Sequence, residues 1–290
     1  MNVRIIPRLD IKGPNLVKGI HFEGLRVLGK PEQFARSYYE NGADELIYMD
    51  AVASLYGRNS LLDVVERTAR HIFIPLTVGG GLRTVDDIRA VLRAGADKVS
   101  LNTAVIQRPE LIREASRRFG SSTIVVSVEA IRNPDGSYEA YVNYGRERTG
   151  VDPFEWAVTA AELGAGELMV TSINSEGTGK GFDLELTRRI AETVPIPVIG
   201  SGGAGKVDHV YDVVTQGGAD AVCLASILHY NQIRYFRAVD EDYSAEGNTV
   251  FLRQGTGFSN IVDATIREIK EYLVQRGILC RELQAEHAIL

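Results

Sequence analysis

The sequence of 290 residues has little cysteine, no long hydrophobic run and no excess of positive charge. Its two cysteines, Cys223 and Cys280, form no C-x-x-C pair, so they indicate neither a disulfide framework nor a zinc site. Cys223 lies in the apolar run DAVCLAS, where a small buried side chain is the simplest interpretation. Neither a metal ion nor a cofactor is expected.

The missing hydrophobic run and the missing positive charge exclude further classes. No apolar stretch approaches the roughly 18 residues of a transmembrane helix. The first residues, MNVRIIPRLD, reach a proline and an aspartate too early for the core of a signal peptide. The formal net charge of −6 disfavours general binding of nucleic acid or membrane surfaces. We therefore expect a cytoplasmic enzyme. The net charge does not exclude a local basic pocket that binds a phosphorylated substrate.

Short apolar runs rich in valine and isoleucine recur along the chain. Continuous apolarity is typical of parallel strands that are buried on both faces. The segments between them show helical patterns that often begin with Pro, Asp or Thr and end in Gly, as in PEQFARSYYENG and DPFEWAVTAAELG. One domain, residues 1–290, with eight such units is predicted to be a (β/α)8 TIM barrel, ahead of a doubly wound sheet. The runs lie at 4–10, 45–50, 73–78, 97–102, 123–129, 167–172, 196–201 and 220–226.

An internal repeat favours the barrel. Residues 74–107 resemble residues 196–230: IPLTVGGG matches IPVIGSGG, and GADKVSLNTA matches GADAVCLASI. Further upstream GADEL matches GAGEL, and the offset is about 122 residues throughout. Two duplicated half-barrels close naturally into a pseudo-twofold ring, whereas an open sheet has no use for that symmetry. Chance matches between common loop sequences are the alternative interpretation.

One segment breaks the repeating pattern. Residues 227–261 separate the eighth predicted strand from the last amphipathic helix, IVDATIREIKEYLVQRG. Whatever follows a strand of a TIM barrel lies on the active face. The segment is therefore an insertion near the site or an ordinary surface loop, and both interpretations stay open.

The repeated glycine turns predict two phosphate sites. A phosphate needs backbone amides that it can approach without a Cβ atom in the way, and TIM barrels commonly provide them after strands 7 and 8. Two equivalent sites imply a substrate with a phosphate at each end. The alternative is that the glycines only allow tight turns. The first phosphate cradle comprises Gly80, Gly81, Asn102 and Thr103, and the second comprises Gly202, Gly203, Ala225 and Ser226.

Two carboxylates end opposite strands of the predicted barrel. Asp10 ends the first apolar run and Glu129 ends the fifth. A carboxylate in that place is costly for structure and useful for chemistry. Opposed carboxylates suit general acid–base work on a substrate between them, although either could instead cap the following loop.

These residues resemble the cyclase subunit family of imidazole glycerol phosphate synthase, from histidine biosynthesis. The matching stretches include RIIPRLDIK, LVKGIHFEGLR, IPLTVGGGLRTVDDIR and DLELTRRIAETVPIPVIGSGGAG, and they cover the chain except for 227–261 and the C-terminal tail. The resemblance implies a (β/α)8 barrel that receives ammonia from a glutaminase partner docked at the barrel floor, the end where the strands begin. It further implies that ammonia cleaves and cyclises a bis-phosphorylated ribulosyl-formimino-carboxamide ribotide to imidazole glycerol phosphate and aminoimidazole carboxamide ribotide.

The resemblance also implies roles for particular residues. Asp10 matches the family's catalytic aspartate, Lys18 the lysine of its mobile first loop, and Glu129 the place of its second catalytic aspartate. These three are the expected catalytic residues. Both phosphate cradles match, and Gly177 joins the phosphate-binding set. Asp50, Thr171, Glu176 and Ser201 complete the expected site. A salt-bridged ring through which ammonia enters is expected from Arg4, Glu45, Lys98 and Glu167, the charged residues that open strands 1, 2, 4 and 6.

Three positions depart from the family pattern. Glu129, Asn174 and Glu176 stand where the family typically has aspartates, and a glutamate is one methylene longer. The departures keep other interpretations open. One is a paralogue that uses the same ammonia relay to amidate another substrate, such as a surface-sugar precursor. Another is the single-chain sugar isomerase of the same duplicated barrel, which has no need of an ammonia ring. The last is a barrel without activity that activates a glutaminase.

Overall fold

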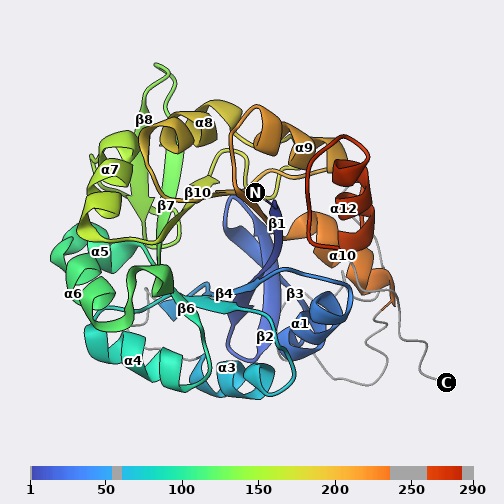
Figure 1. Ribbon diagram of the computed structural model, residues 1–290, viewed down its shortest axis with the longest axis horizontal. Coiled ribbons are helices and arrows are strands. Elements are labelled where there is room, and N and C mark those ends of the chain that lie inside the picture. Colours follow the sequence, from blue (N-terminus) through green and yellow to red (C-terminus); the bar gives the residue numbers. More distant parts are fainter. Residues whose placement is uncertain (1, 54–60, 236–259, 283–290) are drawn as a thin grey trace.

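The computed structural model describes residues 2–53, 61–235 and 260–282. Eight parallel strands pair in a closed ring, in the order β1-β4-β5-β6-β7-β10-β11-β12 and back to β1. The predicted TIM barrel is thus confirmed. Figure 1 looks down this barrel, with the helices arranged around it. The strands are β1 (Arg4–Lys12), β4 (Leu46–Asp50), β5 (Leu76–Gly79), β6 (Lys98–Leu101), β7 (Ile124–Arg132), β10 (Glu167–Ser172), β11 (Val198–Ser201) and β12 (Ala221–Leu224).

Four of the described helices begin at a residue whose side chain caps the first turn. Thr84 and Thr265 form capping boxes at α4 and α12, and Asp152 and Asp183 accept backbone amides at α7 and α8. The helices are α1 (Pro31–Glu40), α3 (Leu62–Ala69), α4 (Val85–Arg93), α5 (Thr103–Gln107), α6 (Glu110–Phe119), α7 (Pro153–Leu163), α8 (Leu184–Thr193), α9 (Val207–Thr215), α10 (Ser226–Tyr235) and α12 (Ile266–Val274), with a 3-10 turn at Ser121–Thr123. Within the described ranges, no helix is long and apolar enough to span a bilayer.

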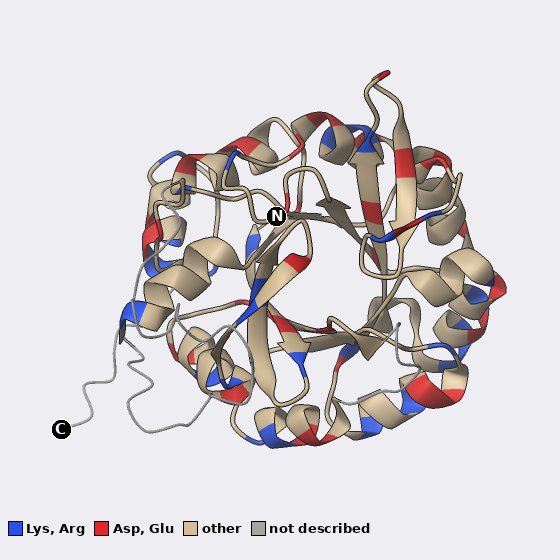
Figure 2. Ribbon diagram, turned by 180° about the vertical axis from the view of Figure 1, so that it is seen from behind, with Lys and Arg blue, Asp and Glu red and all other residues tan. Residues whose placement is uncertain are grey.

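The barrel interior changes in character from one end of the strands to the other. Along β1 the inward positions alternate as Arg4, Ile6, Arg8 and Asp10. An aliphatic layer fills the middle and forms a cluster separate from the main core under the helices. Along β1, Ile6 of this layer separates Arg4 on one side from Arg8 and Asp10 on the other. The aliphatic cluster comprises Ile6, Ile47, Met49, Val125, Met169, Ile199, Ala221 and Cys223. Figure 2 shows that acidic and basic residues alternate over the outer helices.

Two β-hairpins lie at the carboxyl ends of the strands, which we call the barrel mouth. The first joins β2 (Asn15–Ile20) to β3 (Glu23–Gly29) and continues the sheet from β1. The second joins β8 (Tyr138–Val142) to β9 (Glu147–Arg148) and extends β7. Sequence analysis did not predict these strands, and the segment around Lys18 was expected to be a mobile loop.

The predicted insertion at 227–261 is described only at its ends. Its first nine residues belong to α10, which continues the strand–helix pattern after β12. Residues 236–259 lie outside the described residues. Residues 260–264 lead into α12, and the Ala264 amide donates to the carbonyl of Ile227 at 3.1 Å.

Candidate active site

The two predicted catalytic carboxylates lie on opposite strands at the barrel mouth. Asp10 is on β1 and Glu129 on β7, with three strands between them on either side of the ring. Each is 2% exposed. The strand order places both predicted phosphate cradles on the other diagonal, one between β5 and β6 and the other between β11 and β12. A ligand that joins the two cradles would therefore pass between Asp10 and Glu129.

The two carboxylates have different surroundings. The Nε atom of Arg8 donates to Oδ1 of Asp10 at 2.9 Å, so Asp10 has a buried cationic partner. Glu129 has no such partner, and its Oε2 atom finds no hydrogen-bond donor among the described residues. Burial raises the pKa of Glu129 to about 7, against the opposing effects of the Arg8 guanidinium and the Gly145 amide. Near neutral pH Glu129 can therefore either give or take a proton.

Lys18 and Glu176 form a buried ion pair at the mouth. Nζ of Lys18 donates to Oε1 of Glu176 and also to the carbonyl of Gly19 at 2.9 Å. Burial acts to raise the pKa of Glu176, but the Lys18 ammonium and the Arg8 guanidinium keep it below its usual value. The pair ties the first hairpin to the turn after β10, which are 158 residues apart in the sequence.

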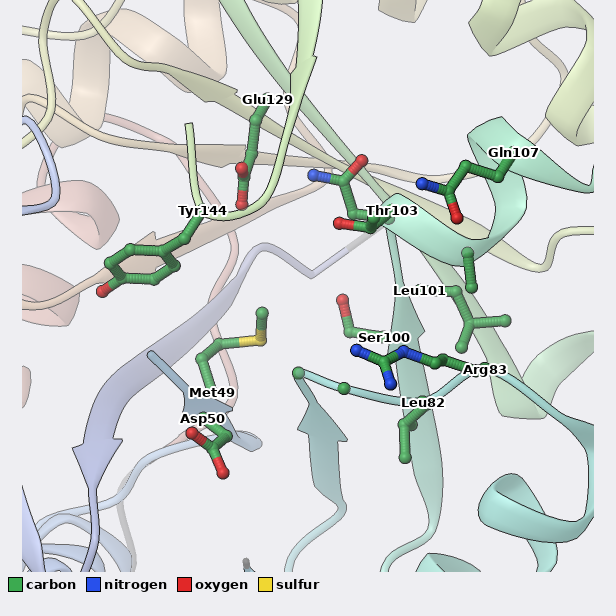
Figure 3. A pocket seen from close by; sticks show the side chains of 14 residues that line it. Met49, Asp50, Leu82, Arg83, Ser100, Leu101, Thr103, Gln107, Glu129 and Tyr144 are labelled. Carbon is green, nitrogen blue, oxygen red and sulfur yellow. The ribbon is translucent and has the colours of Figure 1, made fainter. Parts of the chain in front are cut away.

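The first phosphate cradle lines a pocket that reaches Glu129. Gly80 and Gly81 adopt positive φ angles of 96° and 71°. A Cβ atom on Gly80 would lie 2.5 Å from the carbonyl oxygen of Asp50, so only glycine fits there. Figure 3 shows Glu129 and Tyr144 on one side of the pocket, with Thr103 and Gln107 on another. The lining residues are Met49, Asp50, Gly80, Gly81, Leu82, Arg83, Ser100, Leu101, Asn102, Thr103, Ala104, Gln107, Glu129 and Tyr144.

The polar side chains of this cradle also hold the second hairpin. The Asn102 amide donates to the carbonyl of Tyr141 at 3.2 Å, and Oγ1 of Thr103 accepts the Asn143 amide at 3.0 Å. Because Oγ1 of Thr103 acts as an acceptor in this contact, its own O–H is still available as a donor. Asn102 and Thr103 thus have a structural contact in addition to any contact with a phosphate.

The glycines of the second cradle are needed for close packing of loops. Gly202 and Gly203 have φ angles of 85° and 116°, and a Cβ atom on Gly203 would meet the carbonyl oxygen of Gly181 at 2.0 Å. Gly177 similarly approaches the backbone of Gly19, so it lets the first hairpin lie against the turn after β10. Ser226 begins α10 and follows Ala225, and it is 6% exposed. The geometry supports tight turns at both cradles and is equally compatible with anion binding.

Besides Glu176, three further residues were expected in the site: Asp50, Thr171 and Ser201. Oδ1 of Asp50 accepts the amides of Val52 and Ala53, so this carboxylate holds the turn after β4. Thr171 is buried in the lumen, and its hydroxyl has no partner among the described residues. Ser201 hydrogen-bonds with the thiol of Cys223, whose pKa burial raises to about 12. Cys223 is therefore a buried thiol, as the sequence predicts.

The four charged residues at the barrel floor form a closed ring of ion pairs. Arg4 contacts Glu45 at 2.5 Å and Glu167 at 3.0 Å, and Lys98 contacts the same two carboxylates at 3.0 Å each. Burial acts to lower the pKa of Arg4, but the two glutamates hold it above its usual value. Each cation pairs with both anions, which is the arrangement needed to keep four charges at the inner end of a barrel.

Sequence reasoning missed three mouth residues, Arg8, Phe22 and Tyr144. The rings of Phe22 and Tyr144 come from different hairpins and lie 4.3 Å apart between centroids. Both residues have positive φ angles, 63° and 60°, which bulky side chains rarely adopt. They cover the mouth beside Arg8. The strand alternation in IIPRLD could have placed Arg8 inward beside Asp10, whereas nothing in the sequence paired the two aromatic rings.

The described residues include no group of side chains that resembles the ligand set of a metal site. In residues 2–53, 61–235 and 260–282, no three or more His, Cys, Asp and Glu side chains gather as they would around a metal ion. Asn174 accepts the Arg132 amide at 2.8 Å, so its side chain is used to hold the end of β7.

The fold and the site define an enzyme of the TIM-barrel class, with opposed carboxylates where such enzymes carry their catalytic groups. The model of the family described as "Histidine biosynthesis protein" matches residues 4–234. The imidazole glycerol phosphate synthase subunit HisF of Legionella pneumophila is 58% identical over 207 residues, which are 71% of this chain and 98% of that protein. The subunit HisF of Trichormus variabilis is 50% identical over 236 residues, 80% of this chain and 92% of that protein. The chain belongs to the histidine biosynthesis protein family.

Proposed function

We propose that this protein is the cyclase subunit of an imidazole glycerol phosphate synthase. It uses ammonia to convert the bis-phosphorylated formimino-carboxamide ribotide to imidazole glycerol phosphate and aminoimidazole carboxamide ribotide. The observation that carries the proposal is the pocket in which Glu129 faces the first phosphate cradle, with Asp10 across the mouth. The 58% and 50% identity to proteins of this activity supports it.

Some of the mouth residues bind the substrate, and others transfer protons. The two cradles hold the phosphates, so the reacting atoms lie between Asp10 and Glu129. Glu129, with a pKa of about 7, exchanges protons with the substrate, and Asp10 acts from the opposite side. Lys18 contributes a cation beside the second cradle through its pair with Glu176. Because the carboxylates face each other across the substrate, one can accept a proton while the other donates one.

We infer that a glutaminase subunit docks at the barrel floor and delivers ammonia through the ring of Arg4, Glu45, Lys98 and Glu167. The ring stands at the opposite end of the lumen from the mouth, with the aliphatic layer between them. A neutral molecule crosses an aliphatic layer at lower cost than an ion does. The layer therefore lets ammonia pass and holds back ammonium.

The test is turnover of the ribotide by purified protein with ammonium salts as the nitrogen source. We expect the ribotide to be consumed and both products to form. Expression of the gene should also restore growth of a histidine auxotroph that lacks its own cyclase. A protein that binds the ribotide but never turns it over, with ammonium or with a glutaminase, would refute the proposal.

A second candidate is a paralogue that supplies the same ammonia to another acceptor, such as a surface-sugar precursor. The observation that favours it is the replacement of two expected aspartates by Glu129 and Glu176, both buried at the mouth. In that case the wild type should be nearly inert on the ribotide, and Glu129→Asp with Glu176→Asp should raise its activity. For the cyclase, Glu129→Asp should keep or raise the activity that the wild type already has.

A further inference from the structure

Arg8 is a buried cation with unused hydrogen-bonding capacity. Its side chain is 3% exposed and lies on the inner face of β1, two residues before Asp10. Nε is taken up by Asp10, but Nη1 and Nη2 have no acceptor among the described residues. The ring of Phe22 lies 5.2 Å from Cζ and covers one face of the guanidinium.

This arrangement is costly if its only purpose is to stabilise the fold. A buried donor without an acceptor loses its hydration and regains nothing, and a guanidinium has five N–H groups to satisfy. Replacing a buried ion pair by apolar side chains of similar volume is often neutral or stabilising. The ion pair with Asp10 uses only the Nε atom of the Arg8 guanidinium. The two remaining nitrogens are therefore best explained by a ligand.

Within the described part of the chain, the barrel mouth also holds a hydrogen-bond acceptor without a donor, across the ring from Arg8. Nη1 and Nη2 point their N–H groups in one plane, a pattern that complements a planar carbonyl-containing group. Glu129 lies on β7, opposite β1 in the ring, and its Oε2 atom lacks a donor among the described residues. A donor edge on one strand and an acceptor oxygen on the opposite strand match a primary carboxamide that lies between them, whose oxygen accepts and whose amino group donates.

We propose that Arg8 binds the carboxamide oxygen of the substrate and that Oε2 of Glu129 receives an N–H of the same group. This inference rests on the proposed function, because the ribotide carries a carboxamide. Arg8 and Glu129 lie on the diagonal that a ligand crosses when it joins the two phosphate cradles. The contact positions the reacting part of the substrate next to Asp10, and Arg8 determines the specificity for the carboxamide.

The experiment compares two ligands that differ only in that group. Calorimetric titration measures the binding of aminoimidazole carboxamide ribotide and of aminoimidazole ribotide, which lacks the carboxamide, to wild type and to Arg8→Met. A hydrogen bond to a charged group is worth roughly tenfold or more in affinity, so the wild type should prefer the carboxamide ligand by about that factor. In Arg8→Met the preference should fall to within about twofold, while the affinity for the ligand without carboxamide stays unchanged.

Two further variants control for folding and for charge. Arg8→Lys keeps a cation beside Asp10 but has no planar edge, so it should lose most of the preference even if Arg8→Met does not fold. Arg118→Met, on the exposed surface of α6, should behave as wild type.

Equal weakening of both ligands in the Arg8 variants, or full selectivity in Arg8→Lys, would overturn the assignment of Arg8. A wild type that does not prefer the carboxamide ligand would do the same. If the wild type turns over the ribotide and the Arg8 variants keep their selectivity, only this inference fails. If the wild type neither binds these ligands nor consumes the ribotide, the proposed function fails with it.

Discussion

At the scale of single residues, the two mouth carboxylates differ through their neighbours rather than their burial. Asp10 and Glu129 are equally buried, but only Asp10 has a guanidinium within hydrogen-bonding distance. Among the described residues Glu129 lacks such an ion-pair partner, and burial raises its pKa to about 7. Two carboxyl groups in such different surroundings are typical of acid–base pairs in active sites.

The raised pKa of Glu129 makes stability depend on pH. Below pH 4.5, the ordinary pKa of a glutamate side chain, the carboxyl is protonated in both the folded and the unfolded chain, so it contributes nothing. Above pH 7 the folded protein holds a buried carboxylate at a cost of roughly 3 kcal/mol. We expect Glu129→Gln to match the wild type near pH 4 and to become more stable than it between pH 5 and 7. Chemical denaturation at several pH values measures the difference, and a constant difference would contradict the prediction.

Asp10→Asn should abolish turnover of the ribotide while leaving its binding nearly unchanged. The carboxylate is proposed to move protons rather than to hold a phosphate, so its loss removes an interaction of the transition state. The variant also leaves Arg8 without its anionic partner, and we expect a loss of stability of about 3 kcal/mol. Turnover with ammonium salts and ribotide titration separate the two effects. Activity within a few-fold of wild type would show that Asp10 has a structural role alone.

At the scale of elements, the glycine turns and the two hairpins form the mouth. Glycine is required where the backbone of one loop touches that of the next, as at Gly80 against Asp50 and Gly203 against Gly181. The hairpins place Lys18, Phe22 and Tyr144 over the strand ends, where each contacts a residue distant in the sequence. The site therefore combines carboxylates on the barrel strands with residues from the connecting segments.

Gly80→Ala should destabilise the protein far more than Gly13→Ala does. Both positions have a positive φ, 96° and 59°, so each variant carries the strain of a left-handed backbone, about 1 kcal/mol. Around Gly13 no atom lies within 4 Å of an added Cβ, whereas at Gly80 the Asp50 backbone is 2.5 Å away. We expect the Gly80 variant to lose about 3 kcal/mol or more in denaturant unfolding, and to bind the phosphate end of the ligand less tightly. Equal losses in the two variants would refute the contact.

At the scale of the whole molecule, the barrel separates two charged ends by an apolar middle. The closed ring of ion pairs lies at the floor and the acid–base groups lie at the mouth. The aliphatic layer between them excludes ions more strongly than small neutral molecules. This order of layers gives physical support to the delivery of ammonia from one end of the barrel to the other.

Lys98→Met should uncouple glutamine hydrolysis from cyclisation. Lys98 contacts both Glu45 and Glu167, so its removal leaves two carboxylates that only Arg4 can compensate. We expect turnover with ammonium salts to stay within a few-fold of wild type, because the mouth is unchanged. Turnover with glutamine and a glutaminase subunit should fall by roughly tenfold or more, a loss of about 1.4 kcal/mol or above. Parallel loss of both activities would mean that the ring only stabilises the fold.

Patterns in the sequence were enough to predict the barrel and to place its eight strands to within about three residues. Asp10 and Glu129 were predicted to end their strands, but β1 continues to Lys12 and β7 to Arg132. The barrel and the places of its strands follow from local periodicity, capping residues and the spacing of the repeat, which act over a few residues at a time. The family resemblance also brought together Arg4, Glu45, Lys98 and Glu167, and the structure joins them in one ring.

The closure of the mouth and the pairing of groups inside it depend instead on long-range contacts in the folded chain. The contact of Lys18 with Glu176 joins positions 158 residues apart, and Phe22 meets Tyr144 from another hairpin. Formation of the first hairpin depends on pairing with β1, a contact that no local pattern encodes. In the sequence, Arg8 is one basic residue in an apolar strand. Only the tertiary structure shows that Arg8 is enclosed in the lumen. There, desolvation makes each unpaired N–H donor costly, and this cost is the reason to expect a ligand at Nη1 and Nη2.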